Sequence, residues 1–235
     1  MNSLSTILLN LGFEKNKLNN FTVIGLGRFG MAVAIALENL EKSVMAIDKD
    51  ERKIEEIKDH VSYAKVLDAT NIDALRDAGV QDSDVVIVAI GDDVEASVFT
   101  TLLAKELGVK LVIARAISAY HRKILEKIGA DFVVFPEAEY GELLTQKLVL
   151  PNIIDFMEVS SGLKIVEIKP PKKFLGKPLE EFLALRDKYD VTLLAIMRGD
   201  KILTKPSPQY IVAEEDILYL VGSVEEVNRL VEKNS

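Results

Sequence analysis

The sequence predicts an α/β protein in which a Rossmann-type, doubly wound parallel sheet is followed by a smaller α+β domain. Three observations indicate this. Short apolar runs alternate with helical patterns up to about Pro151, as in βαβ units, and beyond it the alternation stops. The first run, residues 21–24, leads directly into Gly-Leu-Gly-Arg-Phe-Gly at residues 25–30. The second run ends on an acid, Asp48.

The stretch at residues 21–48 has the order strand, G-x-G-x-x-G, helix, strand, acid, which is typical of dinucleotide-binding Rossmann folds. Gly25 would allow the tight turn, Gly27 would let the backbone approach a phosphate, and Gly30 would let the helix pack close to the strand. Free N–H groups at the start of that helix would face the phosphate. Asp48 would accept hydrogen bonds from a ribose diol. The alternative is a Rossmann-like fold with an empty or vestigial pocket.

The rest of the first domain is expected to add four strands with helices between them. The charged run at residues 49–59 predicts a surface helix with Ile54 and Ile57 facing inward. Thr70, with Asp73 three residues later, is expected to form a capping box for the next helix. The right-handed crossover rule favours the strand order 3-2-1-4-5-6. The expected strands are residues 64–67, 84–90, 111–114 and 132–135, with helices that end at Gly79, Gly108, Gly129 and near residues 150–151.

Several polar residues follow these strands, at the sheet edge where ligands of open α/β folds bind. Asp68 follows the third strand, Gly91 the fourth and Arg115 the fifth. Arg28 lies in the first turn after the glycine loop, where a guanidinium can reach a terminal phosphate bidentately. A solvated surface charge is the alternative for Arg28, and a plain ion pair is the alternative for Arg115.

Beyond residue 151 the pattern predicts a small α+β domain, which begins between residues 150 and 162. Gly199-Asp200 indicates a hairpin, and Ser223 with Glu226 is expected to cap a last helix. The expected strands are residues 153–159, 164–168, 191–197, 202–204 and 217–221, with an amphipathic helix at 179–189. The predicted division is an N-terminal extension at 1–20, a nucleotide-binding domain at 21–150, and a linker with the second domain at 151–235.

The composition excludes several classes of protein. The apolar content of 49% and charged content of 28% are those of an ordinary globular protein, and a formal net charge of -8 argues against nucleic-acid binding. With no cysteine, the chain has no disulfide, no thiolate nucleophile and no cysteine-based metal site. No apolar run approaches the roughly 20 residues of a membrane span. Leu4, Ile7, Leu8 and Leu11 lie at helical spacing, so residues 1–20 form either a short amphipathic helix or a partly ordered tail.

The sequence offers little for catalysis. A dehydrogenase needs a residue that moves a proton while the nicotinamide takes a hydride. The chain has two histidines: His60 ends a predicted surface helix, and His121 lies in the first turn of a helix at the ligand edge, as an interface or pocket residue. No zinc-protease, P-loop or nucleophile-elbow motif is present. Binding without turnover is therefore favoured over the alternative, an NAD-dependent oxidoreductase of the small Rossmann type.

Five segments together resemble one protein family. They are the glycine loop at 25–30, Ala-Ile-Asp at 46–48, Asp-Ala-Thr at 68–70, Val-Ala-Ile-Gly at 88–91 and Leu-Glu-Lys-Ile-Gly-Ala-Asp at 125–131. This pattern resembles the RCK (regulator of K+ conductance) family, the cytosolic regulatory subunits of bacterial Trk and Ktr potassium uptake systems and the gating domains of some potassium channels. The likeness spans about residues 20–233, with a TrkA-N-like first domain and a TrkA-C-like second domain. One such unit in one chain looks more like the Ktr type than the tandem Trk type.

The resemblance implies a cytoplasmic, non-enzymatic protein that forms dimers and octameric rings at the inner face of the membrane, beneath a TrkH/KtrB-type potassium-translocating subunit. Nucleotides in the Rossmann clefts would change the shape of the ring, with ATP/ADP expected first and NAD(H) or AMP as alternatives. Arg28 would sense the terminal phosphate, and Glu137 would bind a divalent cation at a subunit contact. Some members bind cyclic di-AMP in the second domain, where Arg186 would be a candidate. Asn71 replaces the glutamate often found after Asp-Ala-Thr, which alters the pattern near the ribose.

Asp48 suits any unmodified ribose and disfavours NADP, because a carboxylate repels a 2′-phosphate. The residues predicted to bind the nucleotide are Gly25, Gly27, Arg28, Phe29, Gly30, Asp48, Lys49, Asp68, Ala69, Thr70, Ile90, Gly91 and Arg115, with Glu137 predicted for the metal.

Overall fold

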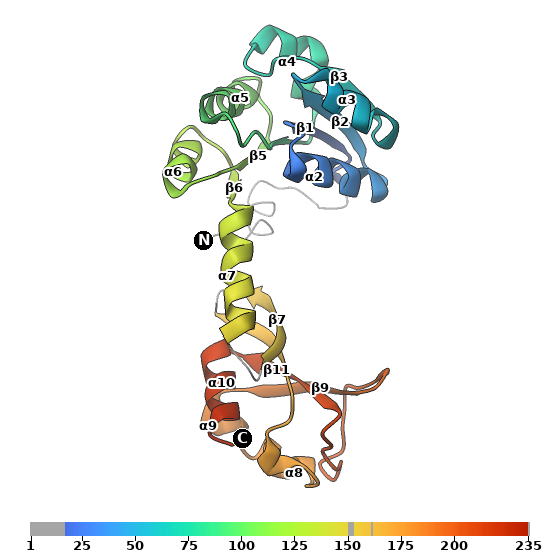
Figure 1. The fold of residues 1–235 in the computed structure, drawn as a ribbon, viewed down its shortest axis with the longest axis vertical. Coiled ribbons are helices and arrows are strands. Elements are labelled where there is room, and N and C mark those ends of the chain that lie inside the picture. The colour runs from blue at the N-terminus through green and yellow to red at the C-terminus, as the bar shows by residue number, and fades with distance from the viewer. Residues whose placement is uncertain (1–16, 150–152, 161, 235) are drawn as a thin grey trace. The chain divides into compact units, whose positions relative to one another are not determined.

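The computed structural model describes residues 17–149, 153–160 and 162–234 of the chain (Figure 1). The predicted N-terminal extension therefore lies outside the described residues as far as position 16. The chain divides into two compact units, Met1–Glu139 and Tyr140–Ser235, so the division falls within helix α7 (Pro136–Val149). The limits predicted for the functional domains, with a boundary after residue 150, stay a prediction. Each unit is described by itself below.

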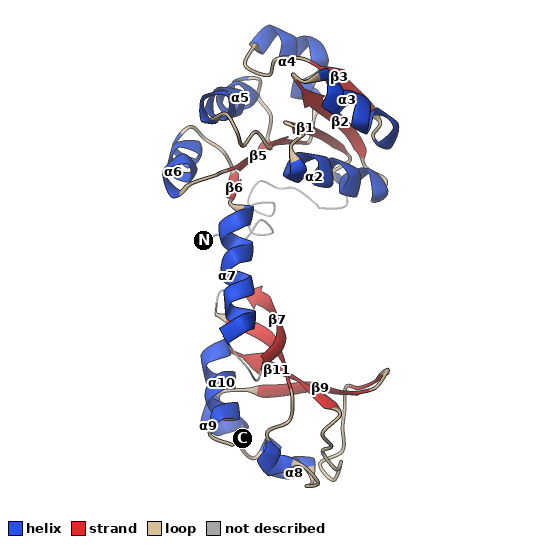
Figure 2. Cartoon of the chain, in the orientation of Figure 1, coloured by secondary structure: helices blue, strands red, loops and turns tan. Residues whose placement is uncertain are grey.

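The first unit contains a six-stranded, fully parallel sheet in the order β3-β2-β1-β4-β5-β6, which confirms the predicted Rossmann order (Figures 1 and 2). All four residues of the central strand β4 are buried, as expected for a strand covered on both faces. The six strands are β1 (Asn20–Ile24), β2 (Ser43–Asp48), β3 (Tyr63–Val66), β4 (Val85–Val88), β5 (Leu111–Arg115) and β6 (Phe132–Val134).

Helices cover both faces of this sheet. One apolar cluster joins the sheet to α2 (Arg28–Asn39) and α3 (Glu51–Ile57), and a second joins it to α4 (Ile72–Ala78), α5 (Val94–Glu106) and α6 (Ala119–Lys127). The inward positions predicted for α3, Ile54 and Ile57, are both buried. Two short 3-10 turns, Lys58–His60 and Val80–Asp82, follow α3 and α4. Left-handed glycines end α4, α5 and α6 as predicted, at Gly79, Gly108 and Gly129.

The predicted capping box at Thr70 is wrong. Asn71 caps α4 instead, since its side-chain oxygen accepts hydrogen bonds from the N–H groups of Asp73 and Ala74. The Thr70 hydroxyl donates to the Asp68 carboxylate at 2.8 Å. Thr70 and Asn71 are both good capping residues, and the chain starts the helix one residue later than the pattern suggested.

The second unit contains a five-stranded antiparallel sheet in the order β10-β9-β11-β8-β7. Its core gathers buried side chains such as Phe174, Phe182 and Leu230 against one face of the sheet. The strands are β7 (Ile153–Ser160), β8 (Leu163–Ile168), β9 (Thr192–Arg198), β10 (Lys201–Leu203) and β11 (Asp216–Gly222); a 3-10 turn at Lys172–Phe174 and the helices α8 (Leu179–Leu183), α9 (Arg186–Tyr189) and α10 (Val224–Glu232) complete the unit.

Two of the local expectations for this unit are confirmed. The hairpin at Gly199-Asp200 joins β9 to β10, and the Ser223 hydroxyl accepts a hydrogen bond from the N–H of Glu226 at the start of α10. The helix predicted at residues 179–189 is instead two short helices, α8 and α9, because the chain turns between them: the N–H of Leu185 bonds to the carbonyl of Phe182.

Candidate functional site

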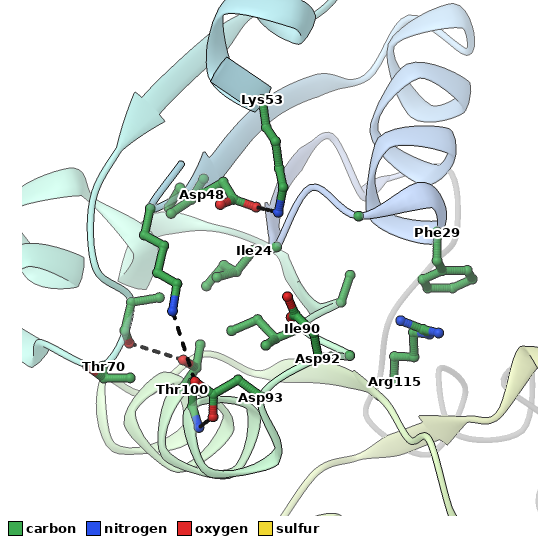
Figure 3. A pocket seen from close by; sticks show the side chains of 18 of the residues that line it. Ile24, Phe29, Asp48, Lys53, Thr70, Ile90, Asp92, Asp93, Thr100 and Arg115 are labelled. Carbon is green, nitrogen blue, oxygen red and sulfur yellow. Dashed lines mark hydrogen bonds and ion pairs between the residues drawn. The ribbon is translucent and has the colours of Figure 1, made fainter. Parts of the chain in front are cut away.

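A cavity of about 960 Å³ lies in the first unit at the carboxyl ends of the parallel strands (Figure 3). The sheet register brings these ends together, because Ile24 at the end of β1 is level with Ile47 on β2 and with Val88 on β4. The volume of the cavity is in the range of small-molecule and cofactor sites. All the residues predicted for the nucleotide line this cavity except Gly30, and Glu137 lines it as well.

The three glycines of the loop have different reasons to be glycine. Gly25 has φ +93°, and a side chain there would also press on Ile90. An added Cβ at Gly30 would overlap the Gly25 carbonyl oxygen, so glycine at this position allows the tight packing of the loop. Gly30 itself does not line the cavity. Gly27 has φ -72° and ψ -176°, which any residue can adopt, and an added Cβ would meet nothing within 4 Å. The packing of the chain therefore does not require glycine at position 27, and the space beside it lies at the start of α2, which no side chain caps.

Asp48 is buried and held by three hydrogen bonds. Its Oδ2 accepts from the N–H of Leu26 at 2.7 Å and from Lys53 Nζ at 3.0 Å, and its Oδ1 accepts from the N–H of Asp50 at 2.9 Å. Burial alone would raise the pKa of Asp48, but the two backbone N–H groups and Lys53 outweigh it and hold the pKa below its usual value. The carboxylate is thus ionised at neutral pH, and it fixes the glycine loop.

The ends of β3 and β4 supply two more acids. Asp68 accepts hydrogen bonds from the N–H and the hydroxyl of Thr70, which lower its pKa in that order of importance. Asp93 caps α5 by accepting from the N–H of Ala96 at 2.9 Å, and Lys49 lies 4.0 Å from its other oxygen. Thr70 therefore stabilises an acid of the cavity rather than a helix.

Arg115 forms the cationic side of the cavity. It makes an ion pair with Glu137, and its guanidinium lies 5.9 Å from the centroid of the Phe29 ring. A side chain at position 91 would overlap this guanidinium, so Gly91 leaves room for it. The pKa of Glu137 is lowered by its own backbone N–H first and then by Arg115 and Arg28. Arg115 is thus both an ion-pair partner and a cavity residue.

Some predicted roles are not supported by the structure. His121 does not line the cavity: it is 2% exposed, burial lowers its pKa, and its Nε2 has no hydrogen-bond partner among the described residues. His60 is exposed in the turn after α3. Glu137 belongs to no metal-binding cluster within the chain, since the described ranges contain no group of three or more His, Asp or Glu that could hold a metal ion. A metal site shared between subunits stays a prediction. The side chain of Arg186 lies outside what the structure describes.

Sequence reasoning missed several residues of the cavity. Lys53 could have been found from the sequence, because it follows Asp48 by five positions in a helix that starts directly after the strand. Thr100 comes from the middle of α5 and donates to the carbonyl of Ala69 at 3.2 Å, a contact that the sequence alone does not reveal. The missed lining residues are Ile24, Ile47, Lys53, Leu67, Ala89, Asp92, Asp93, Ala96 and Thr100.

Within the part of the chain that the structure describes, no helix is long and apolar enough to cross a membrane. Two domain families match the sequence, the TrkA-N domain over residues 21–136 and the TrkA-C domain over residues 163–234.

Three curated relatives match nearly their whole length. The Ktr system potassium uptake protein C of Bacillus subtilis (strain 168) is 39% identical over 209 residues, which cover 89% of this chain and 94% of the relative. The Ktr system potassium uptake protein A of the same organism is 36% identical, with 93% and 97% covered. The Ktr system potassium uptake protein A of Vibrio alginolyticus is 36% identical, with 86% and 91% covered.

Solved structures of the GsuK channel share the fold. One superposes with a TM-score of 0.61 at 15% identity and covers 92% of this chain and 39% of that chain. The structure described as the GsuK channel bound to NAD has a TM-score of 0.53 at 27% identity, covering 93% of this chain and 38% of that one. This chain thus spans less than half of either channel chain. The two matched domain families and the relatives of similar length show that this chain belongs to the RCK family, as a TrkA-N/TrkA-C protein of the Ktr potassium-uptake type.

Proposed function

We propose that this protein is the cytosolic, nucleotide-binding regulatory subunit of a Ktr-type potassium uptake system. The main support for the nucleotide site is the open space at Gly27, because the packing of the chain gives no reason for a glycine at this position. A phosphate placed there would meet the N-terminus of α2, where backbone N–H groups and the helix dipole favour an anion. The Ktr relatives and the NAD-bound GsuK structure support the family role and the class of ligand.

The cavity fits the parts of an adenine nucleotide. Arg28 and Arg115 supply positive charge on the side of the glycine loop, where the phosphates would bind. Asp48 lies at the end of β2, the position from which an acid contacts a ribose in Rossmann folds. Leu67 and Ile90 supply apolar surface for a base. We assign the same residues to the nucleotide as the sequence predicted, with Gly30 shaping the loop rather than touching the ligand.

ATP and ADP are the ligands that we propose first, with NAD(H) or AMP as alternatives, and Glu137 is the residue that we propose for a divalent cation at a subunit contact. The partner is a TrkH/KtrB-type potassium-translocating subunit at the cytoplasmic face of the membrane, on which the protein acts as an octameric ring. The function that we propose is regulatory rather than enzymatic, because the relatives of similar length are potassium uptake proteins. A ligand shifts such a ring only by binding its two conformations unequally.

Arg28 supplies a source of unequal binding. It is exposed in the first turn of α2 and close enough to Glu137 to lower the pKa of that acid. An additional γ-phosphate would give its guanidinium a charge-assisted contact that ADP lacks. Arg28→Ala is therefore expected to keep nucleotide binding and to lose about tenfold discrimination between ATP and ADP, by calorimetric titration. Unchanged discrimination in the variant would remove Arg28 from this role.

The test of the proposed function is a calorimetric titration of the purified protein with ATP, ADP, NAD and NADH, with the mass in solution measured in parallel. We expect adenine nucleotides to bind preferentially to an octamer, and co-expression with the potassium-translocating subunit to give nucleotide-dependent potassium uptake. Tight NADH binding by a monomer or dimer, with a substrate-dependent change in nicotinamide absorbance, would instead establish the oxidoreductase.

A further inference from the structure

The carboxylate of Asp48, at the end of β2, already accepts a hydrogen bond from another side chain, that of Lys53. Of the hydrogen bonds that Asp48 accepts, two come from the backbone N–H groups of Leu26 and Asp50 and the third from Lys53. A carboxylate offers about four lone-pair sites, so about one is left. A ribose that donates both of its hydroxyls needs two. A nucleotide must therefore share this carboxylate with Lys53 or displace it.

Lys53 is the partner that can adapt to a ligand. The Leu26 and Asp50 contacts are made by backbone within the glycine loop and at the start of α3, whereas Lys53 acts through a long, flexible side chain that is 35% exposed. Its ammonium lines the cavity and points toward Asp48 (Figure 3). An ammonium has three donors, and one contact with Asp48 leaves two for oxygen atoms of a ligand.

We propose that Lys53 sets the selectivity of the site at the 2′ position of the ribose, an inference that rests on the proposed nucleotide function. Asp48 alone would repel a 2′-phosphate. An ammonium 3.0 Å from Asp48 Oδ2 offsets that negative charge and can donate to a phosphate oxygen in its place. The site with Lys53 thus tolerates a 2′-phosphorylated ligand far better than the acid by itself would, and binds the unmodified ribose as well.

Lys58 provides a comparison outside the cavity. It lies in the turn after α3, its side chain is 46% exposed, and its ammonium makes an ion pair with Glu55. It is not among the residues that line the cavity. Removal of the Lys58 charge therefore changes the net charge of the protein as Lys53→Met does, without changing the cavity or uncovering Asp48.

The experiment uses two pairs of probes that differ only by a 2′-phosphate: NADH with NADPH, and AMP with adenosine 2′,5′-bisphosphate. Dissociation constants are measured by calorimetry for the full chain and for Lys53→Met, Lys53→Arg and Lys58→Met, each checked for an unchanged thermal unfolding transition. The quantity compared is the ratio of the constant for the phosphorylated probe to that for its partner. We expect this ratio to rise by about tenfold in Lys53→Met and to stay near that of the unmodified protein in Lys53→Arg and Lys58→Met.

The rise should also shrink at high ionic strength, since an exposed ammonium is screened by salt. An unchanged ratio in Lys53→Met, with both members of a pair still bound, would overturn the assignment and reduce Lys53 to a residue that positions Asp48. An equal change in affinity for both members of a probe pair also leaves the ratio unchanged, so it would lead to the same conclusion about Lys53. Failure of the unmodified protein to bind any of the four probes, and to bind ATP or ADP in the same titrations, would instead contradict the proposed nucleotide site itself.

Discussion

Among the described residues, each unit buries one aspartate whose carboxylate accepts hydrogen bonds from backbone N–H groups and from a basic side chain, but the two carboxylates have different roles. Asp216 in the second unit is 0% exposed and receives both a bidentate Arg198 guanidinium, at 2.6 and 2.9 Å, and the Tyr210 hydroxyl at 2.9 Å. The N–H of Ala213 is its further partner. Asp48 in the first unit is 7% exposed and lines a cavity, and beside two backbone N–H groups its side-chain partner is a flexible lysine.

The difference shows how the same chemistry gives structure in one place and a binding site in another. The partners of Asp216 occupy both its oxygens with rigid geometry, and they tie residues 198, 210 and 213 around the start of β11. Asp48 instead keeps a partner that can move and an open space beside it. We therefore expect changes at Asp216 to affect stability and changes at Asp48 to affect ligand binding.

The largest effect on stability is expected from Asp216→Asn. The amide removes the charge that pairs with Arg198 and places N–H groups where donors already point, so the free energy of unfolding should fall by about 3 kcal/mol. Urea unfolding measures the change. Glu215→Gln is the matched control, because Glu215 lies 3.7 Å from the same guanidinium but is 62% exposed, and its loss should cost under about 0.5 kcal/mol. Equal effects of the two substitutions would show that burial of Asp216 does not matter.

Asp48→Asn is expected to act mainly on binding. Lys53 is partly exposed, so its loss of a partner costs little, but the amide nitrogen replaces one of the two oxygens that accept from the N–H groups of Leu26 and Asp50. The free energy of unfolding should therefore fall by about 1–2 kcal/mol. Affinity for an adenine nucleotide should fall by roughly thirtyfold, because a charged acceptor to the ribose is lost. Calorimetric titration beside urea unfolding separates the two quantities. A variant that binds normally but unfolds far more readily would place Asp48 with Asp216 as a structural acid.

Sequence reasoning was most successful where the cause was local or topological. Gly25, Gly27 and Asp48 were placed correctly at the cavity because their positions are set by neighbours in the chain, and the strand order followed from the crossover rule. It failed at Thr70, since two adjacent capping residues compete and the outcome depends on Asp68. Thr100 was missed because its contact with Ala69 spans 31 positions.

The smallest effect is expected in the dependence of stability on pH. Burial would raise the pKa of Asp216, but Arg198, Ala213 and Tyr210 outweigh it and lower the pKa below its usual value. A depressed pKa contributes stability that is present above the unfolded value of about 4 and is lost as the pH falls through the folded value. The gap in unfolding free energy between the unmodified protein and Asp216→Asn should therefore narrow below about pH 4. A gap that stays constant from pH 7 to pH 2 would contradict the ionised pair.

The central claim is that the cavity in the first unit is shaped for a phosphate at Gly27, and Gly27→Ala tests it most directly. The added methyl group meets no atom of the protein within 4 Å, so the free energy of unfolding should change by less than about 1 kcal/mol. The same methyl group would occupy the space of the phosphate, so the affinity for ADP and ATP should fall by at least tenfold in calorimetric titrations. Unchanged stability with unchanged affinity would contradict a phosphate at this position.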